Sequence, residues 1–287
     1  MKHAHLSKFI PALAVSLLLG CDYVDQPLDT GNGGNGGGGD DVVRRVLLED
    51  ITGHLCNNCP AAAQIAAQLQ GVYGSEELVV VAIHAGDYFS EPANPPNGDG
   101  SYSTNFQTVA GNEYADTWSI SFLPTGMVSR RLFNNSITLS ESAWGSAVAE
   151  IIGEPADLEI WFESLDYQGG SIETTVKVAV LNDLAGDHNL TVYLTEDHII
   201  DWQYDNQASP PNVPDYEHRH VLRDNLNGTW GEVAVAGAAS AGDTLTFTYT
   251  RPIAANVLEP DNCSLVAYVY NTTTYEVMQV RERKFQP

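Results

Sequence analysis

The stretch Val42–Gly86, VVRRVLLEDITGHLCNNCPAAAQIAAQLQGVYGSEELVVVAIHAG, holds two apolar runs on either side of an alanine-rich segment. VVRRVLLE at 42–49 predicts a strand. PAAAQIAAQLQGVYG at 60–74 predicts a helix, because its larger apolar residues recur at near-helical spacing. LVVVAIHAG at 78–86 is continuously apolar, which is typical of a strand buried on both faces. The stretch therefore predicts a βαβ unit with parallel strands, whose chemistry lies at the carboxyl ends of those strands.

Two cysteines, Cys56 and Cys59, lie between the first predicted strand and the helix. A CxxC pair at this place resembles the thioredoxin fold. Asp50 stands six residues before Cys56, where thioredoxins keep a buried carboxylate, and Pro124 in FLPT is placed like their cis-proline loop. The resemblance implies an α/β thioredoxin-like domain over residues 42–153. In it, Asp50 would accept the proton of Cys59 and Pro124 would shape a substrate groove.

The CxxC motif departs from that of thioredoxins in three ways. Leu55 replaces the tryptophan before the first cysteine, and Asn57-Asn58 replaces the central Gly-Pro. Pro60 has no N–H to donate to the carbonyl of Cys56, so we expect the regular helix to begin at Asn57 or Asn58. In a redox pair Cys56 would be the accessible thiolate that attacks, and Cys59 would resolve the mixed disulfide.

The sequence leaves three interpretations of this pair open: a redox-active disulfide, a static structural disulfide, and a metal site. The first residues of the chain, described below, predict export to the cell envelope. That compartment is oxidising, which favours a disulfide. A metal site would draw on His54 and His84, since two thiolates and two imidazoles form a tetrahedral set. Cys263, followed by the apolar run SLVAYVY, is expected to be a buried inert thiol.

From Asp157 the pattern changes to alternating apolar and polar residues. Repeated stretches of this kind with Gly and Asn turns predict an antiparallel β-sandwich over residues 154–287. The expected strands are LEIWFES (158–164), IETTVKVAV (172–180), NLTVYLTED (189–197), DTLTFTYT (243–250), SLVAYVYN (264–271) and YEVMQVRE (275–282).

A long segment, IIDWQYDNQASPPNVPDYEHRHVLRDNLNGTW at 199–230, separates the third and fourth of these strands. It is too long for a plain hairpin, and long loops on a sandwich often bind ligands. His218 and His220 would share one face of a strand and could hold a metal ion with Asp215 or Glu217. Solvated residues at the edge of the sheet are the alternative.

The first residues predict export and lipidation. Lys2 and Lys8 precede or flank a short apolar run, Phe9–Leu19, which ends in Leu18-Leu19-Gly20-Cys21. Such a run is too short to span a bilayer as a helix, and its ending resembles the lipobox of bacterial lipoproteins. Residues 1–20 are then a signal peptide, and Cys21 carries lipid that anchors the chain to the membrane. The glycine-rich residues 21–41 are a flexible tether.

Composition excludes several classes of function. The net charge of −24 repels phosphates, so nucleic acid is a poor partner. The chain has no G-x-S-x-G motif and no phosphate-binding loop, which leaves hydrolase and nucleotide chemistry without support. We expect no cofactor.

Five stretches together resemble the outer membrane protein 28-related lipoproteins: LLEDITGHLCNNCPAAA, VVVAIHAG, FLPTGMVSR, HVLRDNLNGTWGEV and VAYVYNTTTYEVMQV. The resemblance covers nearly all of Val42–Phe285 and implies residence in the outer membrane of Gram-negative bacteria. Two hypotheses of function follow. The first is a tethered thiol-disulfide oxidoreductase acting on envelope proteins. The second is a non-enzymatic lipoprotein that binds a ligand or partner through its β-sandwich, with the CxxC as a structural disulfide.

Overall fold

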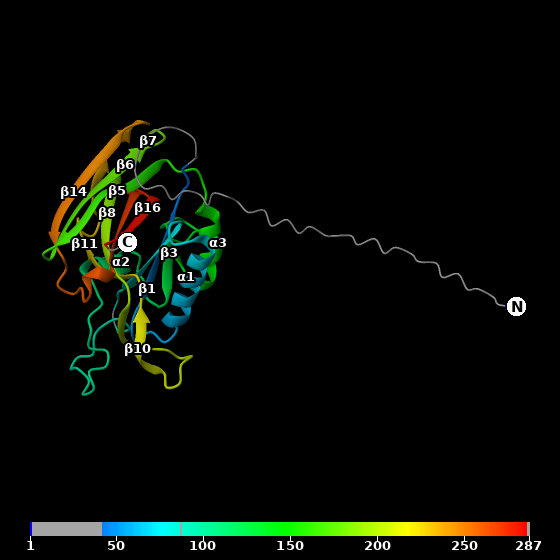
Figure 1. The fold of residues 1–287 in the computed structure, drawn as a ribbon, viewed down its shortest axis with the longest axis vertical. Helices are drawn as coiled ribbons and strands as arrows, with labels where there is room; N and C mark the ends of the chain where they lie inside the picture. The colour runs from blue at the N-terminus through cyan, green and yellow to red at the C-terminus, as the bar shows by residue number, and fades with distance from the viewer. Residues whose placement is uncertain (2–41, 87, 286–287) are drawn as a thin grey trace. The chain divides into compact units, whose positions relative to one another are not determined.

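The structure is a computed structural model that describes residue 1 and residues 42–86 and 88–285 (Figure 1). The predicted signal peptide, the lipidated Cys21 and the tether up to residue 41 therefore lie outside the described residues, residue 1 apart. Among the described residues, no helix is long and apolar enough to cross a bilayer.

Residues 42–153, here called the first segment, contain the predicted βαβ unit. Its elements are β1 (Val46–Thr52), α1 (Cys59–Tyr73), β2 (Leu78–His84), α2 (Val109–Thr117), β3 (Thr125–Val128), β4 (Thr138–Leu139) and α3 (Glu141–Ile151). β1 and β2 are parallel, and β3 adds to the other edge of β1 in the antiparallel direction. β1 starts later than the sequence predicts and runs on to Thr52, so Asp50 lies within the strand.

Both faces of this part of the sheet are covered by helices. α1 and α3 pack on one face, where Trp144 and Val148 of α3 meet Val46 and Leu48 of β1 (Figure 1). α2 packs on the opposite face, where Tyr114 lies in the same core as Leu47. This double coverage explains why the sequences of β1 and β2 are almost continuously apolar.

Residues 154–285, here called the second segment, form mostly strands. They are β5 (Leu158–Gln168), β6 (Ser171–Val180), β7 (Leu184–Ala185), β8 (His188–Glu196), β9 (Ile199–Tyr204), β10 (Asn212–His218), β11 (Val221–Asn225), β12 (Glu232–Val235), β13 (Ala238–Ala239), β14 (Thr244–Pro252), β15 (Cys263–Asn271) and β16 (Val277–Lys284), with a 3-10 turn at Pro260–Asn262. The six strands predicted from alternation correspond to β5, β6, β8, β14, β15 and β16 and are confirmed. β5 and β6 alternate because one face lies in a core, whereas β8 and β15 are buried on both faces.

One large sheet joins the two segments. Its strand order is β16-β15-β8-β11-β2-β1-β3-β4, and β12 pairs with β8 beside this path. The two parts meet where Val221 of β11 lies opposite Ala82 of β2, and the Ala82 N–H donates to the carbonyl of His220 at 2.8 Å. The described residues from Val42 onward belong to one compact unit. A boundary between two domains at residues 153 and 154 stays a prediction.

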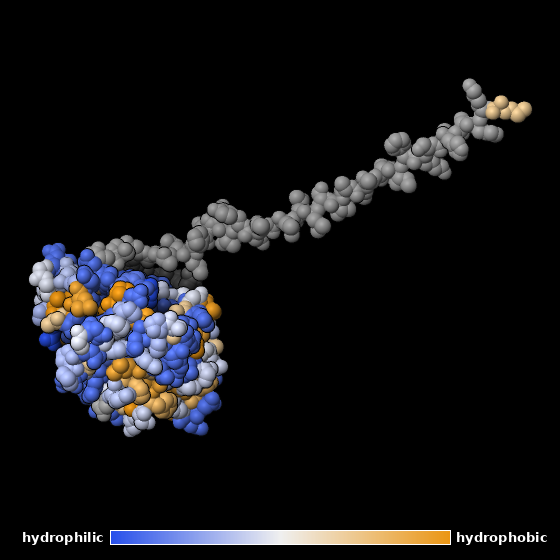
Figure 2. All heavy atoms as spheres, turned by 90° about the horizontal axis from the view of Figure 1, so that it is seen from below, coloured by the Kyte–Doolittle hydropathy of each residue, from blue (hydrophilic) through white to orange (hydrophobic). Residues whose placement is uncertain are grey.

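A second, three-stranded sheet, β14-β6-β5, packs against the β8, β15 and β16 end of the large sheet. Ile160 and Val178 on the small sheet share a core with Leu194 and Leu265 on the large one. Two antiparallel layers with apolar inner faces are the arrangement that the predicted sandwich requires. On the outside, Figure 2 shows hydrophilic residues interspersed with small apolar patches.

Candidate functional site

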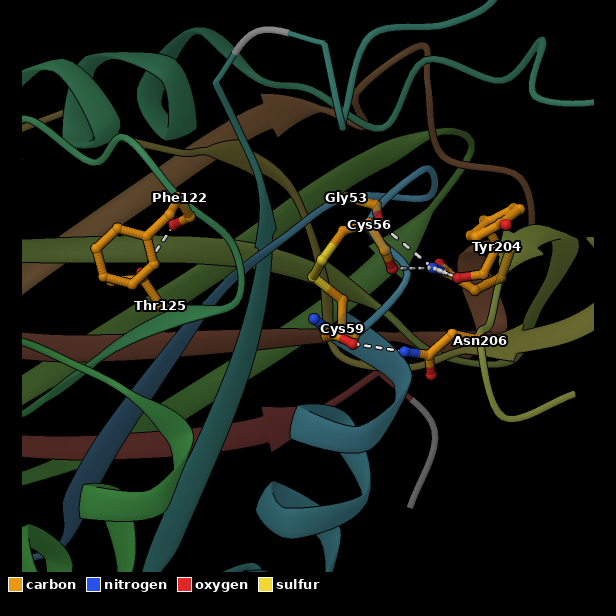
Figure 3. The surroundings of a disulfide bond; sticks show 9 residues. Gly53, Cys56, Cys59, Phe122, Thr125, Tyr204 and Asn206 are labelled. Carbon is orange, nitrogen blue, oxygen red and sulfur yellow. Dashed lines mark hydrogen bonds between the residues drawn. A yellow bond between two sulfur atoms is a disulfide. The ribbon is translucent and has the colours of Figure 1, made fainter. Parts of the chain in front are cut away.

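The CxxC turn links the end of β1 to the start of α1. Cys56 and Cys59 form a disulfide with a Cα–Cα distance of 5.4 Å (Figure 3). Helix α1 begins at Cys59, with Asn58 at the N-cap, so the predicted start at Asn57 or Asn58 is early by at least one residue. The reason is that Asn57 and Asn58 form the turn in which the Cys59 N–H donates to the carbonyl of Cys56.

Both cysteines are buried: the exposed fraction is 1% for Cys56 and 2% for Cys59. The expectation that Cys56 is accessible is therefore wrong for this conformation. The segment expected to be a long loop lies against the CxxC turn. Residues Ile199–His218, here called the capping hairpin, form a separate two-stranded sheet of β9 and β10 that is hydrogen-bonded to this turn.

Hydrogen bonds tie the capping hairpin to residues 53–58, here called the CxxC loop. The side-chain amide of Gln203 donates to the carbonyls of Gly53 at 3.3 Å and Cys56 at 3.1 Å. The Tyr204 N–H donates to the carbonyl of His54 at 2.8 Å. Figure 3 shows the hairpin residues Tyr204 and Asn206 on one side of the disulfide and Phe122 and Thr125 on the other in this view.

Asn206 contributes twice to the same contact. Its backbone N–H donates to the carbonyl of Asn57 at 3.2 Å, and its side-chain amide donates to the Asn58 side chain at 2.7 Å. The sequence does not predict Gln203, Tyr204 or Asn206 as site residues. The signals available were the length of the 199–230 segment and its aromatic content, and neither identifies a contact with a motif some 150 residues earlier.

Asp50 and Cys59 lie at the same small cavity. This cavity, of about 30 Å³, is lined by both residues together with His84, Tyr216 and His218. Burial, with a smaller contribution from the charge of Glu141, raises the pKa of Asp50 to about 7. Its Oδ1 atom has no hydrogen-bond partner among the described residues. The rise in pKa predicted from burial of the strand is confirmed.

Pro124 is buried immediately before β3, and the Leu123–Pro124 peptide bond is cis. β3 pairs with β1 so that Thr125 lies opposite Ile51 and Gly126 opposite Asp50. This register brings Pro124 to the end of β1 from which the CxxC loop departs. The neighbouring Phe122 side chain is 61% exposed.

Three histidines gather beside the CxxC loop. His54 belongs to the loop itself, His84 ends β2 and His218 ends β10. The ring centroids of His84 and His218 lie 5.6 Å apart, those of His54 and His84 lie 6.4 Å apart, and Phe106 contacts all three rings. Burial lowers the pKa of each, that of His218 to about 4, so all three are neutral at pH 7.

The predicted pairing of His218 with His220 on one strand face is wrong. β10 ends at His218, and His220 lies beyond it with a φ of 55°. Its Nδ1 atom lies 3.3 Å from Asp197 instead. In the part of the chain that the structure describes, no group of three or more His, Cys, Asp or Glu side chains is placed to hold a metal ion. The metal interpretation of His54, His84, His218 and His220 thus finds no ligand set there.

Cys263, at the start of β15, is a buried free thiol, as predicted. Burial raises its pKa to about 12. A buried thiol with a raised pKa forms little thiolate at neutral pH, which makes Cys263 poorly suited to thiol-disulfide exchange.

Comparison with known proteins places these features in context. A family model described as outer membrane protein Omp28 matches residues 111–287. HBP35 of Porphyromonas gingivalis has a similar fold, with a TM-score of 0.63 and 17% identity over 85% of this chain and 77% of that chain. A domain of the outer membrane lipoprotein Omp28 from the same organism is 27% identical, over 46% of this chain and 90% of that chain, with a TM-score of 0.31. A search of curated proteins gave no match.

Proposed function

This chain belongs to the Omp28 family of outer membrane proteins, and we propose that at the outer membrane it is a lipid-anchored thiol-disulfide oxidoreductase acting on envelope proteins. Cys56 is the attacking thiol, Cys59 resolves the mixed disulfide, Asp50 carries the proton, and Pro124 shapes the groove for the substrate. Lipid on Cys21 holds the enzyme at the membrane.

The arrangement around the disulfide supports a thioredoxin-like interpretation of residues 42–153. The CxxC turn lies between a strand and a helix of a parallel βαβ unit, which is the context in which such a motif indicates redox function. Pro124 lies at the same end of the sheet, directly before the antiparallel strand β3.

The observation that carries the proposal is the position of Asp50. A carboxyl group with a pKa of about 7 lines one cavity with Cys59, and its Oδ1 atom has no hydrogen-bond partner among the residues that the structure describes. A proton acceptor works best when its pKa is near the operating pH. A purely structural disulfide needs no such group, and burying a carboxylate beside it costs stability.

The reaction balances as a two-electron exchange. In the reduced protein, the Cys56 thiolate attacks a substrate disulfide, which forms a mixed disulfide and releases one substrate thiolate. Cys59 then gives its proton to Asp50, and its thiolate attacks the sulfur of Cys56. The second substrate thiolate leaves, the substrate is reduced, and the Cys56–Cys59 disulfide forms. The same steps in reverse oxidise two substrate thiols.

The test is the second step of this reaction. Reduced protein is mixed with an aromatic disulfide whose released thiolate is coloured, so that attack by Cys56 and resolution by Cys59 each release one equivalent. We expect Asp50→Asn to leave the first release unchanged and to slow the second about 100-fold at pH 7, the low end for a positioned proton acceptor. Equal second-step rates in both proteins at every pH would remove Asp50 from the mechanism.

A second candidate function rests on the burial of the cysteines. Exposed fractions of 1% and 2% are those of a structural disulfide, and they favour a non-enzymatic lipoprotein that binds a ligand or partner through its β-sandwich. If the chain is such a binding protein, the Cys56→Ser, Cys59→Ser double variant should be less stable but should still bind the ligand or partner. For an oxidoreductase it should lose all exchange with disulfide substrates.

A further inference from the structure

The CxxC loop presents a row of backbone acceptors to the capping hairpin. The carbonyls of Gly53, His54, Cys56 and Asn57 all accept hydrogen bonds from the hairpin, two from its backbone and two from the Gln203 amide. Backbone N–H groups that pair with a row of carbonyls are the contacts by which an extended polypeptide adds to a protein edge. Two of the four contacts, those of the Tyr204 and Asn206 N–H groups, are therefore of the kind that a bound polypeptide makes.

The capping hairpin has one buried aliphatic residue and is otherwise held by hydrogen bonds and by ring contacts, such as those of Trp202 with Tyr102 and of His218 with Phe106. β9 and β10 pair with each other and are not part of the large sheet. Their buried residues are Ile199, Gln203 and His218, of which only Ile199 is aliphatic. Two-stranded hairpins are marginally stable on their own, so the closed position of the capping hairpin depends on these ring contacts and hydrogen bonds.

The base of the hairpin is well defined. The His220 N–H donates to the Asp197 carboxylate at 2.8 Å, which joins the residues just outside its two ends. His198 directly before the hairpin and His220 shortly after it both have positive φ values, of 58° and 55°. The hairpin is therefore a single element that leaves and re-enters the fold at one point, next to the β11–β2 contact.

We propose that the capping hairpin is an autoinhibitory element that occupies the docking site of an extended polypeptide substrate at the CxxC loop. This inference rests on the proposed oxidoreductase function. Exchange at Cys56 occurs only when the hairpin has moved away, and the substrate strand then takes over the carbonyls that Gln203, Tyr204 and Asn206 occupied. The bond changes in the exchange are those given above, and the cap governs access to the Cys56 sulfur.

The primary test measures how fast a water-soluble phosphine reduces the Cys56–Cys59 disulfide in the mature chain. Gln203→Ala removes the bonds to Gly53 and Cys56, and Asn206→Ala removes the side-chain bond to Asn58. The matched control is Gln207→Ala, an exposed residue of the same hairpin whose side chain makes no hydrogen bond to the described CxxC loop. We expect Gln203→Ala to accelerate reduction about tenfold, equivalent to about 1.4 kcal/mol, Asn206→Ala to do so less, and Gln207→Ala to match wild type.

A second measurement separates the cap from the catalytic proposal. Oxidised protein is incubated with an extended peptide that carries two cysteines, and the rate of peptide oxidation is followed. An equal acceleration of both reactions in Gln203→Ala supports the inference. If the phosphine reduces both Gln203→Ala and Asn206→Ala at the wild-type rate, the capping hairpin does not limit access to the disulfide and the inference is wrong. Faster phosphine reduction with no peptide oxidation in any variant overturns the proposed function, and with it the polypeptide as the displacing partner.

Discussion

Asp50 affects stability and the proposed chemistry in opposite directions. Its pKa of about 7 shows that the folded protein holds the carboxyl proton more tightly than the unfolded chain, in which the ordinary value is 3.8. The ionised form is therefore the costly one in this fold. The same burial places a group that can take up a proton beside Cys59.

The stability of the oxidised protein should reveal this cost. Because the folded-state pKa is the higher one, Asp50 destabilises the fold progressively as the pH rises from about 4 to 7, by roughly 4 kcal/mol at the upper end. Asp50→Asn should therefore be more stable than wild type in urea at pH 8, and the difference should vanish near pH 4. Parallel stability curves for the two proteins across this range would show that Asp50 is not buried in this way.

Cys21 lies outside the described residues, and its role can be tested directly. We expect Cys21→Ala to release the protein from the membrane fraction, because acyl chains and not an apolar helix supply the anchoring energy. Lys8→Ala, which keeps the lipobox, is the control and should stay membrane-bound. Firm sedimentation of the Cys21→Ala protein with membranes in high salt would contradict the lipid anchor.

Among the helices and strands, the sequence pattern predicted those strands whose faces are each consistently buried or consistently exposed along their length. β2 is buried on both faces and reads as a continuous apolar run, and β5 and β6 alternate because one face is in a core. The capping hairpin has neither pattern. Most of β10 is exposed or half-buried, and its role depends on hydrogen bonds to carbonyls that carry no residue-specific signal.

Some residues of the candidate site could be predicted from the sequence and others could not. Cys56, Cys59, Asp50 and Pro124 could be chosen from sequence because they lie at fixed places relative to one βαβ unit. His218 could not be placed, since its contact with His84 arises only when β11 docks beside β2 and turns the hairpin over the CxxC loop. Gln203 depends on the same long-range docking.

At the scale of the whole molecule, a buried ion pair connects the two segments. Arg130, at the end of β3, and Glu49 of β1 are both fully buried and pair at 2.7 Å. The Arg130 guanidinium also donates to the hydroxyl groups of Tyr193 on β8 and Tyr268 on β15. The first segment is therefore joined to the second by fully buried hydrogen bonds, and we expect residues from Val42 onward to unfold together.

The corresponding variant is Arg130→Ala, which leaves the Glu49 carboxylate buried without its partner. Breaking such a pair costs about 3–5 kcal/mol. Arg131→Ala is the matched control, because the neighbouring Arg131 pairs with Glu154 and Glu276 at the partly exposed surface, where such pairs contribute about 1 kcal/mol or less. Urea unfolding followed by both tryptophan fluorescence and far-ultraviolet circular dichroism should give one coincident transition in each protein. Two separate transitions in wild type would contradict the coupling of the segments.

The Cys56–Cys59 pair is proposed to exchange electrons with other proteins, and its reduction potential decides whether it can. The mature protein is equilibrated with thiol-disulfide buffers of graded potential, and the fraction of oxidised pair is measured by alkylation and mass. We predict a potential between about −270 and −120 mV, the range of dedicated oxidoreductases. A potential below about −300 mV, typical of structural disulfides, would contradict the oxidoreductase function and leave the CxxC as a structural disulfide.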